Sequence, residues 1–140
     1  MKLKKILWIL ATLVVLAGGS IWFYSTVVVG DYRNRAQVAE AVSLLGSAKF
    51  PLAEYFADKQ KWPKTLGEVV AETSGKYTQS VAITKANAGE IELTATMKSE
   101  GVDRRAAGQT VRLMSPDGGK TWLCRPGTMH ENNLPASCRN

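Results

Sequence analysis

A long apolar segment near the amino terminus constrains this chain more than any other feature of its sequence. Residues 6–29 comprise 24 consecutive residues without a charged side chain. A helix rises about 1.5 Å per residue, so this run reaches roughly 36 Å, more than the ~30 Å of a bilayer's hydrocarbon core. The run therefore predicts a transmembrane helix that begins at Ile6, directly after Lys5, and ends at Val29.

The residues around the run predict its orientation. Three lysines lie within residues 2–5, and positive charge favours the cytoplasmic side of a membrane. We therefore expect a basic cytoplasmic leader at 1–5, a transmembrane helix at 6–29 and an extracytoplasmic domain at 30–140. A cleaved secretory signal is the alternative, because the small residues at 17–20 resemble a cleavage site. The residues beyond them stay largely apolar, which favours the anchor.

The remaining chain carries little net charge and few cysteines. Residues 31–140 contain 15 Lys and Arg against 12 Asp and Glu, a balance that neither requires nor excludes a polyanionic partner. Cys124 and Cys138 are expected to form a disulfide in an extracytoplasmic compartment. Closing such a loop of about 15 residues stabilises a fold by roughly 3 kcal/mol. Two cysteines and His130 do not suffice for a structural zinc site, and we expect no metal or cofactor.

A helical pattern follows the apolar run, from residue 31 to residue 61. Its apolar residues recur at helical spacing, which predicts that one face packs on a domain. The residues expected in this packing are Val38, Val42, Leu45, Leu52 and Phe56. The opposite face, expected to meet water or a partner, carries Arg33, Arg35, Gln37, Glu40, Ser43 and Ser47. Pro51 lacks the N–H that a helix uses, so a kink is expected there.

Beyond residue 79 the apolar pattern changes to a period of two, which is typical of β-strands. Four strands are predicted, at Ser80–Lys85, Glu90–Lys98, Thr110–Ser115 and Lys120–Arg125. A connecting segment at 64–79 precedes them, with a short helix expected at Leu66–Glu72. The expected fold class is therefore α+β, with a long helix laid across a small four-stranded antiparallel sheet.

Several short motifs, taken in order, resemble those of type IV pilins of the type IVa group. They are Asp31-Tyr32, Arg35–Ala41, Ala53–Phe56, Lys61–Pro63, Gly75–Tyr77, Ile91–Met97, Thr121–Cys124 and Leu134–Arg139. The resemblance implies the pilin fold, in which a long N-terminal helix packs on a four-stranded antiparallel sheet with a disulfide-closed C-terminal loop. It also implies pilin subunits or pilus assembly proteins as partners, and the loop 124–138 as the recognition surface.

The amino terminus departs from the pilin pattern. The family has a glycine before the cleavage site, then a phenylalanine, and a glutamate as the fifth residue of the mature chain. Lys5, Ile6 and Leu10 stand at these positions here, and the stem proline of the family falls near Val27. Because the prepilin peptidase recognises the glycine, we expect an uncleaved pilin-like protein, retained in the inner membrane with residues 30–140 in the periplasm. Its role would lie in pilus assembly, adhesion or their modulation.

Other functions have less support in the sequence. An ordinary pilus subunit with an atypical leader, located in the fibre at the cell surface, is one alternative. A pilin-like protein that binds DNA during uptake is another, because basic residues in the C-terminal half would contact phosphates. These residues are Arg104, Arg105, Arg112, Lys120 and Arg125, and ordinary solvation is their competing interpretation. No arrangement of nucleophile and base predicts catalysis, so we expect neither an enzyme nor a small-molecule substrate.

Overall fold

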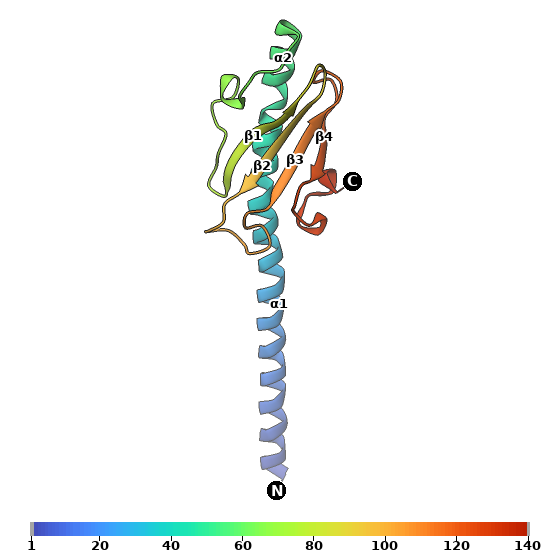
Figure 1. Cartoon of the computed structure of the whole chain (residues 1–140). Coiled ribbons are helices and arrows are strands. Elements are labelled where there is room, and N and C mark those ends of the chain that lie inside the picture. Colours follow the sequence, from blue (N-terminus) through green and yellow to red (C-terminus); the bar gives the residue numbers. More distant parts are fainter. Residues whose placement is uncertain (1, 140) are drawn as a thin grey trace. The chain divides into compact units, whose positions relative to one another are not determined.

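The computed structural model describes the fold of residues 2–139, apart from the side chains of residues 2, 3, 26–28 and 30. Along residues 2–139 the chain forms two α-helices, four strands and three short 3-10 helices (Figure 1). It divides into two compact units, with the boundary between Arg33 and Asn34. The first helix, α1 (Lys2–Ser47), contributes residues to both units.

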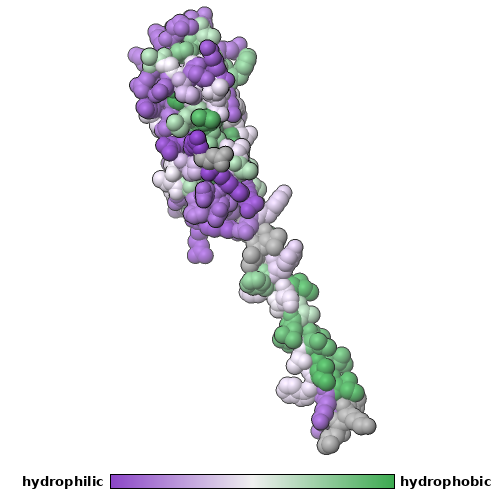
Figure 2. Space-filling view, turned by 90° about the vertical axis from the view of Figure 1, so that its right-hand side faces the viewer, coloured by the Kyte–Doolittle hydropathy of each residue, from purple (hydrophilic) through white to green (hydrophobic). Residues whose placement is uncertain are grey.

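The first unit is the amino-terminal part of α1, and its described side chains are exposed. By length and composition, Lys4–Ser25 is long and apolar enough to cross a membrane. Figure 2 shows the apolar side chains gathered along this helix. Among its described residues, the hydroxyls of Thr12, Ser20 and Ser25 each donate to a backbone carbonyl three or four residues earlier, Thr12 at 2.8 Å and Ser25 at 3.0 Å. Such bonds lower the free-energy cost of placing a hydroxyl in an apolar environment.

The second unit has a helical layer and a sheet, with the core between them (Figure 1). Val38, Leu45 and Leu52 of the helical layer are at most 1% exposed. Val42 and Phe56 are half-buried and pack against the same core. The apolar face that the helical spacing indicated is therefore turned toward the sheet.

The helical layer is divided at Ala48, between the end of α1 at Ser47 and the start of α2 (Lys49–Lys59). Pro51 supplies the physical cause, because it has no N–H to donate to the Ser47 carbonyl and its ring crowds that oxygen. Regular bonding resumes at once, since the Leu52 N–H donates to the Ala48 carbonyl at 3.1 Å. The sequence placed the irregularity at Pro51 itself. The structure has it one turn earlier, beside the carbonyl that the proline fails to bond.

The sheet is antiparallel, in the order β1-β2-β3-β4. Its strands are β1 (Thr78–Ala86), β2 (Ile91–Met97), β3 (Thr110–Ser115) and β4 (Leu123–Pro126). In β2 every second side chain is buried in the core, at Ile91, Leu93, Ala95 and Met97. The predicted α+β fold is confirmed.

Some boundaries differ from those predicted. β1 begins at Thr78 rather than Ser80, and the expected helix Leu66–Glu72 is a single 3-10 turn, η1 (Leu66–Glu68). β4 begins at Leu123 rather than Lys120, because residues 116–122 form a turn organised by Asp117. One oxygen of Asp117 accepts the Thr121 N–H at 2.8 Å, and the other accepts the Thr121 hydroxyl at 2.7 Å. These bonds from Thr121 hold the pKa of Asp117 below its ordinary value.

This turn packs closely on α2 through two glycines. Gly118 and Gly119 have positive φ angles of 75° and 87°. A Cβ on Gly118 would lie 2.8 Å from the Phe56 ring, and one on Gly119 would lie 2.8 Å from the Ala53 Cβ. Both the backbone conformation and the spacing therefore require glycine here.

The C-terminal segment is closed by the disulfide Cys124–Cys138, which confirms the predicted pairing. The bond joins β4 to the 3-10 helix η3 (Ala136–Cys138), and a further 3-10 helix, η2 (Glu131–Asn133), lies between them in the chain. Met129 and Leu134 are 2% and 0% exposed. The segment therefore contributes apolar side chains to the core rather than forming a loose loop.

Candidate interaction surfaces

Three polar side chains of α1 bond the helix to three separate segments of the chain. Asn34 Nδ2 donates to Asn133 Oδ1 at 2.8 Å, and Gln37 Oε1 accepts the Asp103 N–H at 2.8 Å. Glu40 bonds a third segment, at residues 76–78. These residues are three apart, so they lie on one side of the helix. We call Asn34, Gln37 and Glu40 the helix latch.

Glu40 makes the strongest part of this latch. Its Oε1 accepts the N–H groups of Tyr77 at 2.8 Å and Thr78 at 3.0 Å, and its Oε2 accepts that of Lys76 at 3.2 Å. Burial acts to raise the pKa of this carboxyl, but the three N–H donors outweigh burial and hold the pKa below its ordinary value. A Cβ on Gly75 would overlap the Glu40 carboxylate. The loop therefore approaches the helix closely enough to require glycine at this position.

The helical pattern indicates the wrong environment for two of these residues. Gln37 and Glu40 were expected on the face of the helix that meets water or a partner. Gln37 is instead 6% exposed, and Glu40 is half-buried against the loop. The one sequence feature that points to these contacts is the regular spacing of polar residues at 34, 37 and 40. Polarity alone does not distinguish a side chain bonded to a loop from one bonded to water.

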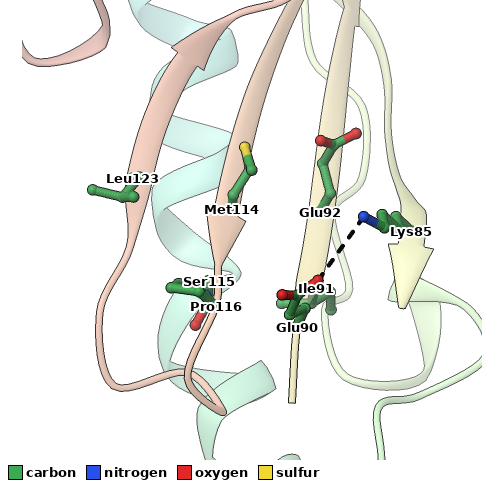
Figure 3. A pocket seen from close by; sticks show the side chains of 8 residues that line it. All are labelled: Lys85, Glu90, Ile91, Glu92, Met114, Ser115, Pro116 and Leu123. Carbon is green, nitrogen blue, oxygen red and sulfur yellow. Dashed lines mark ion pairs between the residues drawn. The ribbon is translucent and has the colours of Figure 1, made fainter. Parts of the chain in front are cut away.

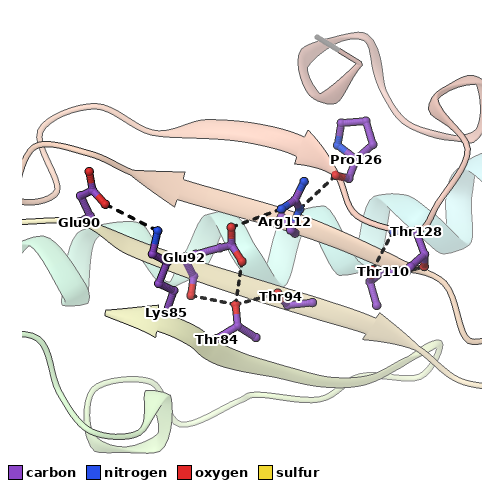
Figure 4. A network of polar contacts seen from close by, with 9 residues as sticks. All are labelled: Thr84, Lys85, Glu90, Glu92, Thr94, Thr110, Arg112, Pro126 and Thr128. Carbon is purple, nitrogen blue, oxygen red and sulfur yellow. Dashed lines mark hydrogen bonds and ion pairs between the residues drawn. The ribbon is translucent and has the colours of Figure 1, made fainter. Parts of the chain in front are cut away.

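The outer face of the sheet, turned away from the helical layer, carries a polar network (Figure 4). Glu92 of β2 lies at its centre and accepts bonds from the Thr84 hydroxyl at 3.1 Å and from Arg112 Nη1 at 3.5 Å. Arg112 Nε also donates to the Pro126 carbonyl at 3.2 Å. The network links all four strands and fixes the Arg112 guanidinium against the sheet.

The five basic residues considered for DNA contact do not form one cluster. Arg104 and Arg105 lie in the β2–β3 connection, whereas Lys120 lies in the β3–β4 turn at the other end of β3. Arg112 and Arg125 are paired across β3 and β4. Acidic groups also accompany two of the five, since Arg105 Nε bonds Asp103 at 3.0 Å and Arg112 bonds Glu92. Of the five, only Arg112 and Arg125 are neighbours across strands, and the other three charges lie at the two ends of β3.

A hollow opens on the outer face of the sheet, near the β1–β2 and β3–β4 turns (Figure 3). It has a volume of about 290 Å³. Met114 and Leu123 give it apolar walls, and Lys85, Glu90 and Glu92 supply charge at its rim. These side chains project from all four strands and the β1–β2 turn, and Figure 3 shows the helical layer behind the sheet. We call this cavity the outer hollow.

The cysteine loop, residues 124–138, presents its own exposed surface. Thr128, His130 and Glu131 are exposed, while the Arg139 Nε that follows the loop donates to the Leu134 carbonyl at 2.9 Å. A small cavity of about 140 Å³ beside the disulfide is lined by residues that include Val42 and Trp122. Within the described residues, no group of three or more His, Cys, Asp or Glu side chains is placed to hold a metal ion.

A helix with an apolar amino-terminal part, packed on an antiparallel sheet with a disulfide-closed C-terminal segment, defines a pilin-type filament protein. The family model for pilin, a bacterial filament protein, matches residues 34–139. The chain belongs to the type IV pilin family. It is therefore similar to structural proteins and not to a family of enzymes.

Known relatives support the same assignment. The fimbrial protein EcpC of Eikenella corrodens is 38% identical over 114 residues, which is 79% of this chain and 73% of the relative. A fimbrial protein of Neisseria meningitidis is 35% identical over 100 residues, covering 67% of this chain and 56% of that protein. The type IV major pilin protein PilE1 of Neisseria gonorrhoeae is 29% identical over 118 residues, which is 79% of this chain and 68% of that protein.

Proposed function

We propose that this chain is a pilin-like structural protein that serves type IV pilus assembly while it remains uncleaved in the inner membrane. Residues 1–5 lie in the cytoplasm, the apolar stem 6–29 spans the membrane, and the globular domain projects into the periplasm. There it associates with pilin subunits or pilus assembly proteins. Membership of the pilin family and the apolar amino-terminal helix support this role.

Leu10 is the observation that carries the proposal. The type IV pilin pattern has a glutamate at the corresponding position, and the cost of its burial in lipid is relieved when it pairs with the amino terminus of a neighbouring subunit. Leu10 is apolar and 53% exposed on α1, so it incurs no such burial cost and gives no such drive to assemble. The stem therefore suits residence in lipid better than transfer into a fibre.

The amino-terminal lysines support retention as well. Lys5 stands where the family has the glycine that the prepilin peptidase recognises, so the leader stays attached. Placing a lysine at the centre of a bilayer costs about 3 kcal/mol or more. Extraction of the stem into a fibre would draw three lysines through the membrane, which opposes release toward the periplasm.

Mass spectrometry of the full chain purified from membranes tests this proposal. The wild-type chain is expected to retain its leader and to lack a methylated amine at residue 6. A variant with Lys5→Gly, Ile6→Phe and Leu10→Glu restores the family pattern and is expected to be cleaved after residue 5 in cells that carry the peptidase. Leu10→Glu alone is the matched control, and it should stay uncleaved. A wild-type chain that begins at Ile6 would instead indicate an ordinary pilus subunit.

The separated basic residues predict that the protein does not bind DNA through a shared patch. In an electrophoretic mobility shift assay with the full chain in detergent, we expect no retardation of double-stranded DNA at physiological salt. Polyanion binding weakens steeply as salt rises, so the assay is run across a salt series. Retardation that Arg104→Ala and Arg105→Ala together abolish would contradict this expectation and assign the β2–β3 connection as a DNA contact.

A further inference from the structure

Two large apolar side chains stand out of the globular unit, on opposite faces. Among the described residues 34–139, Phe50 is 69% exposed and Leu123 is 45% exposed, and the other large apolar residues of this unit are covered to a greater extent. Phe50 lies on α2 in the helical layer. Leu123 projects from the outer face of the sheet, because its neighbour Cys124 turns inward to the disulfide. Because they lie on opposite faces of the unit, these two side chains cannot contact each other within one copy.

The outer hollow has the character of a receptor for an aromatic side chain. Met114 and Leu123 provide apolar contact inside it, and its volume is about 290 Å³. An aromatic ring buries a large apolar area for little loss of conformational freedom, which makes it a frequent anchor at protein interfaces. Phe50 is such a ring, carried on helix α2 and left 69% exposed by the described residues.

The charges beside Phe50 and beside the hollow are complementary. Glu54 follows Phe50 by four residues, so it lies on the same face of α2, and it is exposed. Lys85 lines the hollow, and its ammonium is 3.9 Å from the nearest Glu90 oxygen, with both side chains more than half exposed. An ion pair of this length and exposure is weak. Lys85 is therefore available to a second carboxylate.

We propose that Phe50 of one copy docks in the outer hollow of a second copy, with Glu54 beside Lys85 of that copy. The two surfaces lie on opposite faces, so the contact is head-to-tail and can repeat from copy to copy in an open row. This inference goes beyond the proposed function, because the contact involves only the globular unit. It holds whether the stem is cleaved or retained.

Site-specific photo-cross-linking of the full chain in membranes tests the contact. Benzoylphenylalanine replaces Phe50, and isotopically labelled and unlabelled copies are co-expressed so that adducts between copies are recognised by mass. We expect mixed-label dimers in which position 50 is joined to residues 85–92 or 114–123. The same group at exposed Lys64 is the matched control for collisions driven by the stem. Adducts only to other segments or to other proteins, or no adduct above the Lys64 control, overturn the proposal.

A charge-reversal pair provides a second, independent measurement. Glu54→Lys and Lys85→Glu each place like charges together, and each is expected to lower the yield of the mapped dimer about tenfold. The two changes combined restore an ion pair with its charges exchanged, so the yield of the dimer should return toward that of the unchanged chain. Both sites are exposed, so the fold should tolerate the changes. A double variant no better than the single ones excludes the proposed contact.

Discussion

Replacement of Glu40 with alanine is expected to lower the free energy of unfolding of the globular unit by about 3 kcal/mol. The carboxylate accepts three backbone N–H groups, from Lys76, Tyr77 and Thr78. A hydrogen bond to a charged group contributes about 1.5–3 kcal/mol, and bonds that share one carboxylate are not fully additive. Alanine removes this acceptor, so the three N–H groups of the closely packed loop lose their hydrogen-bond partner.

The measurement uses the full chain in detergent, with a denaturant titration read by pulse proteolysis of the globular unit. Glu54→Ala is the matched control, because Glu54 is an exposed glutamate on the same helical layer and should change stability by less than about 0.5 kcal/mol. If Glu40→Ala and Glu54→Ala have equal effects, the helix latch does not stabilise the fold.

The same carboxylate makes stability depend on pH. Its folded-state pKa is lower than its ordinary value of 4.5, so the folded state favours the ionised form. The stabilisation is therefore complete above pH 4.5 and is lost as the pH falls from there through the folded-state pKa. Glu40→Gln removes this titration. The unfolding free energy of the Glu40→Gln variant should therefore decline less than that of the wild type as the pH falls over this acidic range.

Removal of the disulfide is expected to have an effect of similar size. Replacing Cys124 and Cys138 with alanine frees a loop with a sequence separation of 14. In the chain-entropy account, a cross-link of this length contributes roughly 3 kcal/mol, because it restricts the unfolded chain. The folded segment also loses the bond that holds η3 to β4. Met129 and Leu134, both buried, should become accessible to protease first.

Pulse proteolysis of the double variant under oxidising conditions measures this loss. Ser137→Ala, an exposed change in the same 3-10 helix, is the matched control and should be close to neutral. Reducing agent should bring the wild type to the level of the double alanine variant and leave that variant unchanged. An equal unfolding midpoint for the oxidised wild type and the double variant would contradict the expected contribution.

Much of the fold follows from local patterns in the sequence. The period-two alternation from Ile91 to Met97 predicts a strand with one buried face, and the structure has that strand and that face. The spacing of Val38, Leu45 and Leu52 indicates a single buried stripe, since residues three or four apart share a side of a helix. The ordered motifs that resemble type IVa pilins predict the disulfide and the antiparallel sheet. These features depend on neighbours close in the chain or on a complete family pattern.

Other features depend on partners far along the chain. Glu40 bonds a loop that begins 36 residues later, and Gln37 bonds Asp103, which lies 66 residues later. A polar side chain on a helix has the same local pattern whether it meets water or a distant N–H group. Similarly, the basic residues from Arg104 to Arg125 look clustered in the sequence, but strand β3 carries the chain across the sheet between Arg105 and Lys120.

The sequence by itself determined the apolar stem, the α+β class, the cysteine pair and the residues Lys5 and Leu10, at which this chain differs from the pilin pattern. Only the tertiary structure decided which polar residues of α1 form the helix latch. It also placed Phe50 and the outer hollow on opposite faces of the globular unit. The physical reason is that hydrophobic periodicity indicates whether each residue favours water or the core. The distant residue that a side chain contacts depends instead on how the strands pack against the helix, which local periodicity does not report.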